Sequence, residues 1–349
     1  MKIYLNGFFL RSNKHSGVYR FSLNLLKAID ESLNTDSEFI LVVPRGANIP
    51  HLNKIKITVL NGFTNQHLWE QINLAWTVKN NMLINFANFA PIFKHNQLCV
   101  IHDAIIFRYP QSYSKKFAFL TKLFHCMIVR QSKYIATVSN FSSLEICQII
   151  GTPKNPILVL GNSALNMDDL KVQHEVLNIH KLESHGYVLA VFSQKNSYYK
   201  NVERFLQVVP NLSLPVVCVG SVQFANSPRI ENLIQIGNIS DQDLKSLYCN
   251  ARALVIPSLY EGFGIPALEA MQCNCPVIAS DIEPLREVCG DAAVYFDPEN
   301  IINMTDVINS VISDVNKLEE LVEKGRKRSI LFSWKDYANK ILTRIKVGL

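Results

Sequence analysis

The stretch ALVIPSLYEGFGIPALEAMQCNCPVIASD, from Ala253 to Asp281, decides the fold prediction because it reads as strand, loop, helix and strand in that order. Its first four residues form a short apolar run typical of a buried parallel strand, and Pro257 ends that run. Gly262 and Gly264 let the backbone of the loop approach a ligand closely. Pro266 fits the first turn of the following helix, where its missing N–H costs nothing.

Two carboxylates accompany this turn. Glu261 lies in the loop and Glu269 about one turn inside the predicted helix, so both can face one crevice beside free helix N–H groups. The combination predicts a site for a phosphorylated, hydroxyl-rich ligand.

The same alternation of strand and helix extends in both directions along the chain. A length of 349 residues also favours two domains over one. Predicted strands of the first half are 2–8, 38–43, 55–60, 82–86, 98–101 and 134–138, with helices at 17–33, 69–79, 114–131 and 142–149. Predicted strands of the second half are 187–192, 216–219, 233–236, 253–256, 277–279 and 292–295, and a last helix covers 333–346. These patterns predict an α/β protein with parallel, doubly wound, Rossmann-like sheets, in which ligands bind after the strands.

Composition excludes several classes of protein. The eight cysteines are scattered through apolar segments, and the one close pair, Cys273 and Cys275, has no partner pair or histidine at zinc spacing, so we interpret them as reduced core residues. No charged-then-apolar leader follows Met1, and no apolar run approaches the roughly 18 residues of a membrane span. The default expectation is a cytoplasmic protein.

The net charge of +6 is unevenly distributed along the chain. Residues 1–170 hold 17 Lys and Arg against 9 Asp and Glu, or +8, whereas residues 171–349 hold 18 against 20, or −2. The two halves are therefore expected to meet different partners. Nucleic acid is not expected, because no recognition motif or Arg-rich arm accompanies the basic half.

Longer motifs carry a resemblance to a known family. PSLYEGFGIPALEAM (Pro257–Met271) followed by CPVIAS (Cys275–Ser280) resembles the glutamate-x7-glutamate motif of family 4 retaining glycosyltransferases, which are two-domain GT-B enzymes. Asn6–Leu26 resembles the N-terminal glycine loop of the bacterial surface-polysaccharide branch. Six later segments resemble further landmarks of the family in the right order, and they are Leu68–Gln71, His102–Pro110, Thr137–Ser142, Lys200–Asn201, Ser240–Tyr248 and Arg286–Pro298. The resemblance spans nearly the whole chain.

The resemblance implies a GT-B fold, with two Rossmann-like domains facing across a cleft. Residues 1–165 would form the acceptor domain and residues 166–332 the nucleotide-sugar-binding domain. Residues 333–349 would form a helix that crosses back toward the N-terminal domain.

The resemblance also assigns roles to residues. It implies catalytic roles for His102, Lys200 and Glu261, no metal and no cofactor beyond the nucleotide-sugar co-substrate. The implied donor-binding residues are Gly17, Arg20, Gln194, Lys195, Asn201, Gly262, Phe263, Gly264, Ile265 and Glu269. Two positions depart from the family pattern: Gln194 replaces a frequent arginine, and Ser16–Gly17 supplies one glycine where many members have two.

Elementary chemistry agrees with these roles. A fixed ammonium such as that of Lys200 stabilises a diphosphate leaving group more as the glycosidic bond breaks than before. A carboxylate accepts strong hydrogen bonds from sugar hydroxyls, which suits Glu261 for the donor sugar and Glu269 for the ribose. Taken alone, Lys200 could equally be a solvated lysine, Glu269 a surface glutamate and His102 a packed core residue.

The implied function is retaining transfer of a hexose to a hydroxyl of a lipid-linked O-antigen or capsule acceptor. The first candidate for the hexose is mannose, with GDP-mannose as the donor. A dTDP-rhamnose or UDP-sugar donor stays open, as do a sugar-nucleotide epimerase and a non-catalytic glycan-binding or nucleotide-binding subunit. The sequence contains no readable code for the donor sugar, the base, the acceptor or the oligomeric state.

A basic stretch, residues 104–144, contains six Lys and Arg and no acidic residue. Asp103 and Glu145 flank it. With Phe117, Phe119 and Phe124 on a predicted helix, it could lie on an anionic membrane at the inner face of the cell. A core helix with a solvated basic face explains the same pattern equally well.

Overall fold

The computed structural model describes residues 2–11, 16–34, 37–164, 167, 170–173, 175–192, 198–220 and 230–347. The chain divides into two compact units. The first contains residues up to Asn162 together with the C-terminal segment from Ser333, and the second contains Ser163–Phe332. The sequence-based expectation put this boundary at residue 165.

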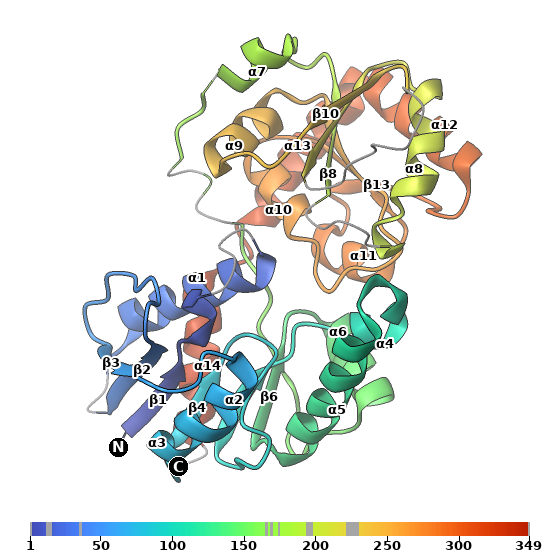
Figure 1. Cartoon of the computed structure of the whole chain (residues 1–349). Helices are drawn as coiled ribbons and strands as arrows, with labels where there is room; N and C mark the ends of the chain where they lie inside the picture. Colours follow the sequence, from blue (N-terminus) through green and yellow to red (C-terminus); the bar gives the residue numbers. More distant parts are fainter. Residues whose placement is uncertain are drawn as a thin grey trace. The chain divides into compact units, whose positions relative to one another are not determined.

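The first unit is built on a seven-stranded sheet of order β3-β2-β1-β4-β5-β6-β7, in which every pair of neighbours is parallel (Figure 1). Its strands are short and mostly buried, because helices cover both faces. They are β1 (Lys2–Asn6), β2 (Glu38–Pro44), β3 (Lys56–Leu60), β4 (Met82–Asn85), β5 (Gln97–Val100), β6 (Tyr134–Thr137) and β7 (Leu158–Val159).

Capped helices connect these strands. Ser16 and Ser114 each accept a hydrogen bond from a backbone N–H at the start of a helix, which fixes where α1 and α5 begin. The connections are α1 (Gly17–Ser32), α2 (Gln66–Leu68), the π-helical η2 (Trp69–Leu74), α3 (Ala75–Val78), α4 (Ile105–Arg108), α5 (Lys115–Gln131), α6 (Asn140–Glu145) and the π-helical η4 (Ile146–Ile150).

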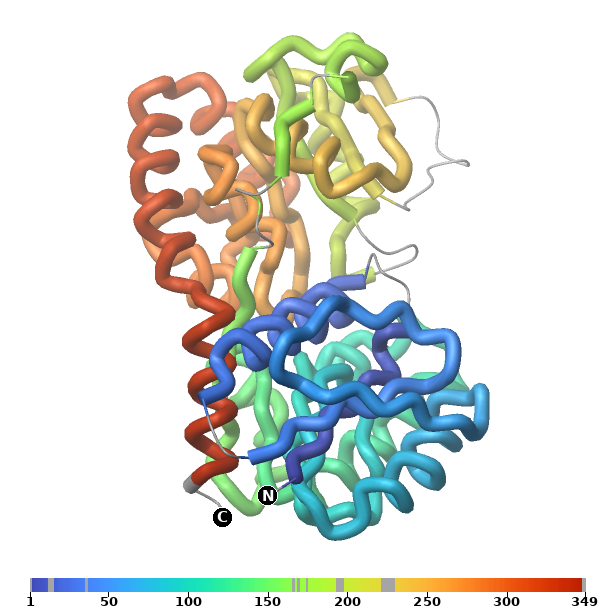
Figure 2. The backbone as a smooth tube through the Cα atoms, turned by 90° about the vertical axis from the view of Figure 1, so that its left-hand side faces the viewer, coloured from blue at the N-terminus to red at the C-terminus, as the bar shows by residue number. Residues whose placement is uncertain are grey.

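The C-terminal helix, α14 (Trp334–Val347), completes the first unit by packing along α1 (Figure 2). Its apolar stripe is buried, with Ile341 and Ile345 fully inaccessible. The Trp334 ring lies 5.4 Å from the ring of Phe21 on α1, and the Tyr337 hydroxyl donates to the Asn162 carbonyl at 3.3 Å. The helix therefore belongs to the core of a unit whose other residues end at Asn162, 171 positions before Ser333.

The second unit contains a six-stranded parallel sheet of order β10-β9-β8-β11-β12-β13. The strands are β8 (Val188–Phe192), β9 (Val216–Gly220), β10 (Leu233–Ile236), β11 (Ala253–Ile256), β12 (Val277–Ser280) and β13 (Ala293–Phe296). The main helices are α7 (Glu175–His180), α8 (Val202–Val208), α9 (Asp241–Asn250), α10 (Ile265–Gln272), α11 (Glu283–Cys289), α12 (Ile301–Ser313) and α13 (Val315–Ser329).

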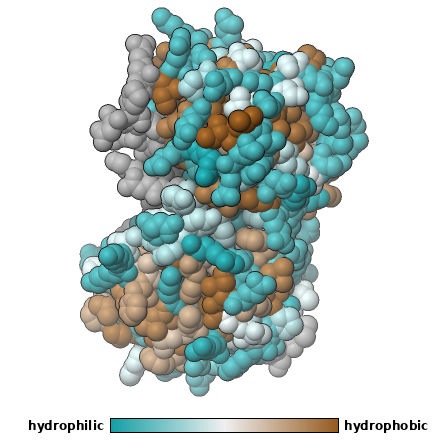
Figure 3. All heavy atoms as spheres, turned by 90° about the vertical axis from the view of Figure 1, so that its right-hand side faces the viewer, coloured by the Kyte–Doolittle hydropathy of each residue, from teal (hydrophilic) through white to brown (hydrophobic). Residues whose placement is uncertain are grey.

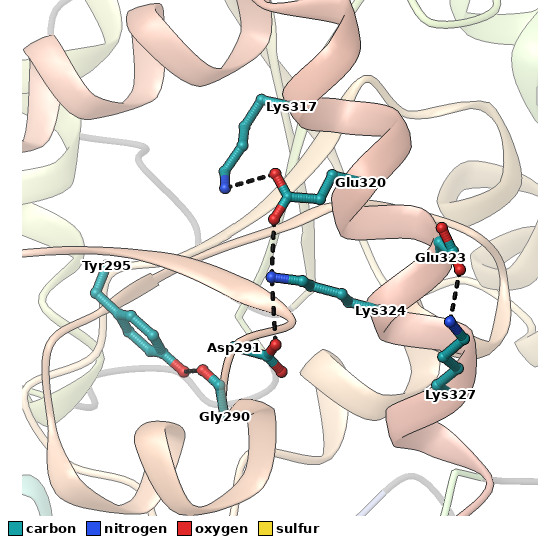
Figure 4. Close-up of polar contacts among 8 residues, drawn as sticks. All are labelled: Gly290, Asp291, Tyr295, Lys317, Glu320, Glu323, Lys324 and Lys327. Carbon is teal, nitrogen blue, oxygen red and sulfur yellow. Dashed lines mark hydrogen bonds and ion pairs between the residues drawn. The ribbon is translucent and has the colours of Figure 1, made fainter.

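Helix α13 carries a ladder of ion pairs on its outer face (Figure 4). Glu320 pairs with Lys317 at 2.9 Å and with Lys324 at 2.8 Å, and Lys324 also reaches Asp291 at 3.2 Å. Hydrogen bonds from the two lysines lower the pKa of Glu320 to about 2. Because these groups lie at the surface, the ladder is expected to add little to stability.

The prediction of two parallel α/β sheets is confirmed. The predicted helix 69–79 begins at Gln66 instead, because the Asn65 side chain caps it, and it contains the η2 π-turn. The predicted helix 142–149 begins at Asn140, because Ser139 caps it. Strand β7 and helix α4 have no counterpart in the sequence-based prediction, since both are too short to show a period. Within the described ranges, no helix is both long and apolar enough to cross a bilayer.

Candidate functional site

The loop between β11 and α10 has a conformation that requires glycine. Gly264 caps α10 with φ of 104°, in the left-handed region, and a Cβ there would lie 2.7 Å from the Leu285 side chain. Only glycine meets both conditions without strain. Pro266 follows in the first turn of the helix, as the sequence predicted.

Lys200 and Glu261 form the polar centre of the second unit. The Lys200 ammonium, at the end of the 3₁₀ turn η6 (Tyr198–Lys200), lies 2.7 Å from Glu261 Oε1, and each side chain is 11% exposed. The Ser258 hydroxyl donates to the same oxygen at 2.7 Å. The Leu259 N–H donates to the Tyr199 carbonyl at 2.7 Å and joins the two loops. The pair thus holds a cation and an anion together at a largely buried position, on two loops joined by a backbone hydrogen bond.

Asn201 supports this pair through its amide. It is left-handed, with φ of 57°, and its Nδ2 donates to the carbonyls of Pro257 at 3.0 Å and Pro298 at 2.8 Å. Arg204 donates to Asn201 Oδ1 at 2.8 Å. Since both amide hydrogens are engaged, the side chain holds together the loops that carry Lys200 and Glu261.

Glu269 lies inside α10 and is buried. The Tyr248 hydroxyl of α9 donates to Glu269 Oε2 at 3.1 Å. Burial, followed by the neighbouring Glu269 carboxylate, raises the pKa of Tyr248 well above its ordinary value, so the phenol remains protonated and acts as a donor. Two carboxylates, Glu261 and Glu269, are therefore each oriented by a hydroxyl group from the protein.

The other loop residues assigned to donor binding occupy different environments. Phe263 is buried and packs edge-on against Phe332 with ring centroids 5.6 Å apart, so its side chain belongs to the core. Gly262 and Ile265 are half-buried at the loop and at the first position of α10. These two residues can offer backbone groups to a ligand.

His102 follows β5 in the first unit and is buried. Its Nε2 lies 3.0 Å from the Phe86 carbonyl, which can only accept, so Nε2 carries the hydrogen and Nδ1 is left as an acceptor. Burial lowers the pKa of His102 to about 4, against a smaller opposite effect of that carbonyl. The imidazole is therefore neutral at physiological pH.

Helix α1 brings Gly17 and Arg20 to the same region of the first unit. The Phe21 ring meets the His102 ring edge-on with centroids 4.6 Å apart, and Arg20 is its neighbour in the first turn of the helix. Gly17 is the first helical residue after the Ser16 cap, where the helix dipole is positive. The first unit thus gathers His102, Gly17 and Arg20, and the second gathers Lys200, Asn201 and the Glu261–Glu269 segment.

Known proteins resemble this chain in sequence and in fold. Residues 178–328 match the family model described as glycosyl transferases group 1. The chain is 28% identical over 296 residues to O-antigen chain mannosyltransferase B of Escherichia coli, covering 78% of this chain and 77% of the relative. It is 29% identical over 325 residues to O-antigen chain mannosyltransferase RfbU of Salmonella typhimurium, covering 85% and 87%.

A solved structure supports the fold. The structure of WaaG, a glycosyltransferase involved in lipopolysaccharide biosynthesis, is similar with a TM-score of 0.72 at 12% identity, covering 99% of both chains. Residues 178–328 thus match the group 1 glycosyl transferases, and the whole chain has the GT-B fold.

Two of the residues that the sequence assigns to donor binding, Gln194 and Lys195, lie outside the described residues. Within the described part of the chain, no group of three or more His, Cys, Asp or Glu side chains could hold a metal ion. All eight cysteines are free.

Two residues that orient Glu261 and Glu269, Ser258 and Tyr248, were not predicted from the sequence. Ser258 stands three residues before Glu261, a spacing that allows a local hydrogen bond and could have been noticed. Tyr248 is 21 positions from Glu269, and their contact follows only from the packing of α9 on α10.

A buried polar network in the first unit was also missed. Glu70 of η2 is almost inaccessible, and its Oε1 accepts from Asn6 at 3.0 Å and from Gln66 at 3.1 Å. Asn6 also donates to Asn85 at 3.1 Å, which links the ends of β1 and β4. Burial raises the pKa of Glu70 to about 7, although the two hydrogen bonds oppose this. Its position in a helix with apolar neighbours gave no sign of this network.

Proposed function

We propose that the chain is a retaining transferase that moves a hexose from a nucleotide diphosphate to a hydroxyl of a lipid-linked surface-polysaccharide acceptor. Mannose from GDP-mannose is the first candidate donor, because two relatives aligned over most of the chain are O-antigen chain mannosyltransferases. The acceptor would be an O-antigen or capsule intermediate at the inner face of the cell membrane, and the enzyme would be cytoplasmic.

The observation that carries the proposal is the contact between Lys200 and Glu261 at 2.7 Å, eight residues before the buried Glu269. We assign Lys200 to the diphosphate, Glu261 to hydroxyls of the donor sugar and Glu269 to the ribose. A donor entering this site would exchange the Lys200–Glu261 pair for two new charge-assisted contacts. Gly262, Gly264 and Ile265 would add backbone groups, with Asn201, Ser258 and Tyr248 as positioning residues.

The proposed chemistry needs no group beyond these residues and the donor. The bond between the anomeric carbon and the diphosphate oxygen breaks, and the acceptor oxygen bonds to the same face of that carbon. The acceptor proton passes to the leaving diphosphate oxygen. Lys200 stabilises the negative charge that the diphosphate gains, which is an interaction stronger in the transition state than in the ground state.

The first unit is proposed to contribute His102, Gly17 and Arg20. A neutral His102 with an accepting Nδ1 suits a hydroxyl of the sugar and does not suit a diphosphate. Gly17 and Arg20 at the positive end of α1 suit an anion. The two other assigned residues, Gln194 and Lys195, remain proposals from sequence.

Other assignments make different predictions. A UDP-sugar or dTDP-rhamnose donor would leave the reaction unchanged, whereas an epimerase would release a modified nucleotide sugar without an acceptor. A non-catalytic binding subunit would bind nucleotide and transfer nothing.

A panel of GDP, UDP and dTDP in a thermal-shift assay separates the donors. A nucleotide at 100 times its dissociation constant stabilises the protein by about 2.7 kcal/mol, so the cognate base is expected to give the largest shift. The shift should persist in chelator, because the proposal includes no metal. No shift with any of the three, or a shift that depends wholly on added metal, would contradict the proposal.

A further inference from the structure

One face of the first unit exposes an apolar stripe along the continuous helix α2–η2–α3. Leu68, Ile72 and Trp76 stand four residues apart on its outer side, and Trp76 is 80% exposed. The inner side of the same helix is ordinary core, with Trp69 and Leu74 fully buried. The buried side already anchors the helix, so the exposed Trp76 is not needed for folding. A large exposed aromatic side chain of this kind indicates a surface that binds a partner.

A pocket lies beside the stripe. It has a volume of about 540 Å³ and separates the helix from the segment 91–96, and its lining includes Lys79, Phe93, Lys94, His95 and Asn96. Phe93, at its rim, is 85% exposed. The segment is fixed in place by Gln71, which donates to the Ala90 carbonyl at 3.0 Å and accepts from the Ile92 N–H at 2.8 Å. The pocket is therefore a built feature between two anchored elements.

The pocket contains a buried cation that is incompletely satisfied. Lys94 is 8% exposed, and among the described contacts its ammonium donates only to the carbonyl of Lys79 at the C-terminus of α3. Burial lowers the pKa of Lys94 to about 8, so the ammonium is less stable than in water although still mostly charged at neutral pH, and an anion in the pocket would stabilise it. Lys79 and His95 line the same space.

The surrounding surface is strongly biased toward positive charge. From residue 39 to residue 144 the sequence contains eleven Lys and Arg but only two acidic residues, Glu70 and Asp103. Glu70 is buried and does not contribute to the surface. A surface that combines aromatic tips with cations and lacks acids complements an anionic, partly apolar partner.

Helix α5 extends this face. The His67 ring of α2 lies 5.0 Å from the Phe124 ring of α5, so the two helices are neighbours on one side of the sheet. Phe119 and Leu123 are exposed on α5, with Lys115 and Lys116 about one turn before Phe119 and Lys122 directly before Leu123. Figure 3, which views the side of α4 and α5 in Figure 1, shows hydrophobic and hydrophilic atoms mixed on this unit.

We propose that the pocket beside Lys94 binds the phosphate of an anionic phospholipid, while Trp76 and Phe93 insert at the level of the headgroups. Aromatic side chains with an apolar body prefer this depth of the bilayer, and lysines nearby bind its negative surface. The inference concerns a docking surface and does not rest on the proposed donor, acceptor or sugar. It differs from the sequence-based expectation for residues 104–144 because the pocket and both inserted aromatics lie outside that stretch.

The test is binding to vesicles of phosphatidylcholine with and without phosphatidylglycerol at low salt. The wild-type chain is expected to sediment with the anionic vesicles and not with the neutral ones. The variant Trp76→Ala/Phe93→Ala should reduce this partitioning at least tenfold, and Lys94→Gln should remove the preference for phosphatidylglycerol. Matched controls in the second unit, Ile302→Ala/Ile330→Ala and Lys171→Gln, should bind as wild type. Inorganic phosphate added in solution should compete only weakly.

Tryptophan fluorescence shows which part of the protein contacts the vesicle. Trp69 is buried and Trp334 half-buried, so quenching by brominated acyl chains should come from Trp76 and disappear in Trp76→Phe. Unchanged melting temperatures of the variants would show that they fold. Vesicle binding without this quenching, equal binding by the Trp76→Ala/Phe93→Ala variant, or no binding by the wild type would overturn the proposal. Charge reversal at Lys115, Lys116 and Lys122 tests α5 separately, and loss of binding there alone would also contradict it.

Discussion

At the scale of single residues, the charged groups of the candidate site already pair with one another in the structure. Lys200 and Glu261 satisfy one another, and Ser258 donates to the same carboxylate oxygen. Once a donor has taken the place of Glu261, an ammonium held in position by its loop needs little reorganisation to stabilise the leaving diphosphate, which is the condition under which fixed charges accelerate a reaction most.

Replacing Lys200 by alanine should therefore reduce kcat far more than it reduces donor affinity. Loss of one fixed donor to a developing negative charge costs about 10²–10³-fold in rate. The measurement is steady-state transfer with the cognate donor, and Lys181→Ala, an exposed lysine of the same unit, is the control. A variant with unchanged kcat would show that the diphosphate is neutralised elsewhere.

Glu70 allows a prediction about pH. Its pKa in the folded protein is about 7, whereas an unfolded chain releases the proton near 4.5. The folded state therefore binds more protons between these values, and Glu70 reduces stability as pH rises through this window. At roughly 1.4 kcal/mol per pKa unit, the complete effect above pH 7 is on the order of 3 kcal/mol.

Glu70→Gln keeps the shape of the side chain and removes this ionisation. Its melting temperature should exceed that of the wild type at pH 8 and approach it at pH 4.5. Glu319→Gln, on the exposed face of α13, should show no such dependence. An equal change in melting temperature at both pH values would contradict the assignment of the proton to Glu70.

A residue could be identified from the sequence when its contacts are local and not when its partner lies far away in the chain. The Glu261–Glu269 segment, Lys200 and His102 were recognisable because short motifs surround them. The partners Tyr248 and Asn6 were not, because their contacts join residues 21 and 64 positions apart. Lys94 was not noticed either, since a lysine after an apolar run gives no indication of burial.

At the scale of elements, one turn decides the geometry of the site. Gly264 combines a left-handed backbone with close contact to Leu285, and α10 with Glu269 starts directly after it. The sequence indicated this turn because two glycines and a proline bracket it. The π-helical η2 could not be predicted, since an apolar helical period does not distinguish a single π turn from an α-helix.

Gly264→Ala should destabilise the protein by about 1–3 kcal/mol, through the unfavourable φ and the contact with Leu285. Gly237→Ala is the matched control, because it has no positive φ and open space around it. Chemical denaturation of both variants gives the comparison. If Gly264→Ala unfolds like Gly237→Ala, the loop is not held as described.

At the scale of the whole molecule, each unit has a core of its own, and α14 belongs to the first unit although it follows the second in sequence. Strand and helix alternation predicted both sheets. The packing of α14 on α1 could not be derived from its period alone, which shows an apolar face but not what covers it.

Ile341→Ala should therefore destabilise the first unit selectively. Removing a fully buried isoleucine costs about 2–5 kcal/mol, and the lost contacts lie against α1. Hydrogen exchange should show weaker protection in residues 17–32 and unchanged protection in β11 and β12. Ile330→Ala, an exposed isoleucine, is the control. Equal loss of protection in both units would contradict the division.

Retaining transfer by Lys200 and Glu261 is tested most directly by measuring transfer of sugar from GDP-mannose to a lipid-linked acceptor in the presence of chelator. NMR gives the anomeric configuration of the product. We expect release of GDP and a product that retains the configuration of the donor. The rate should fall at least 10²-fold in Lys200→Ala and in Glu261→Ala. A product of inverted configuration, or unimpaired transfer by both variants, would contradict it.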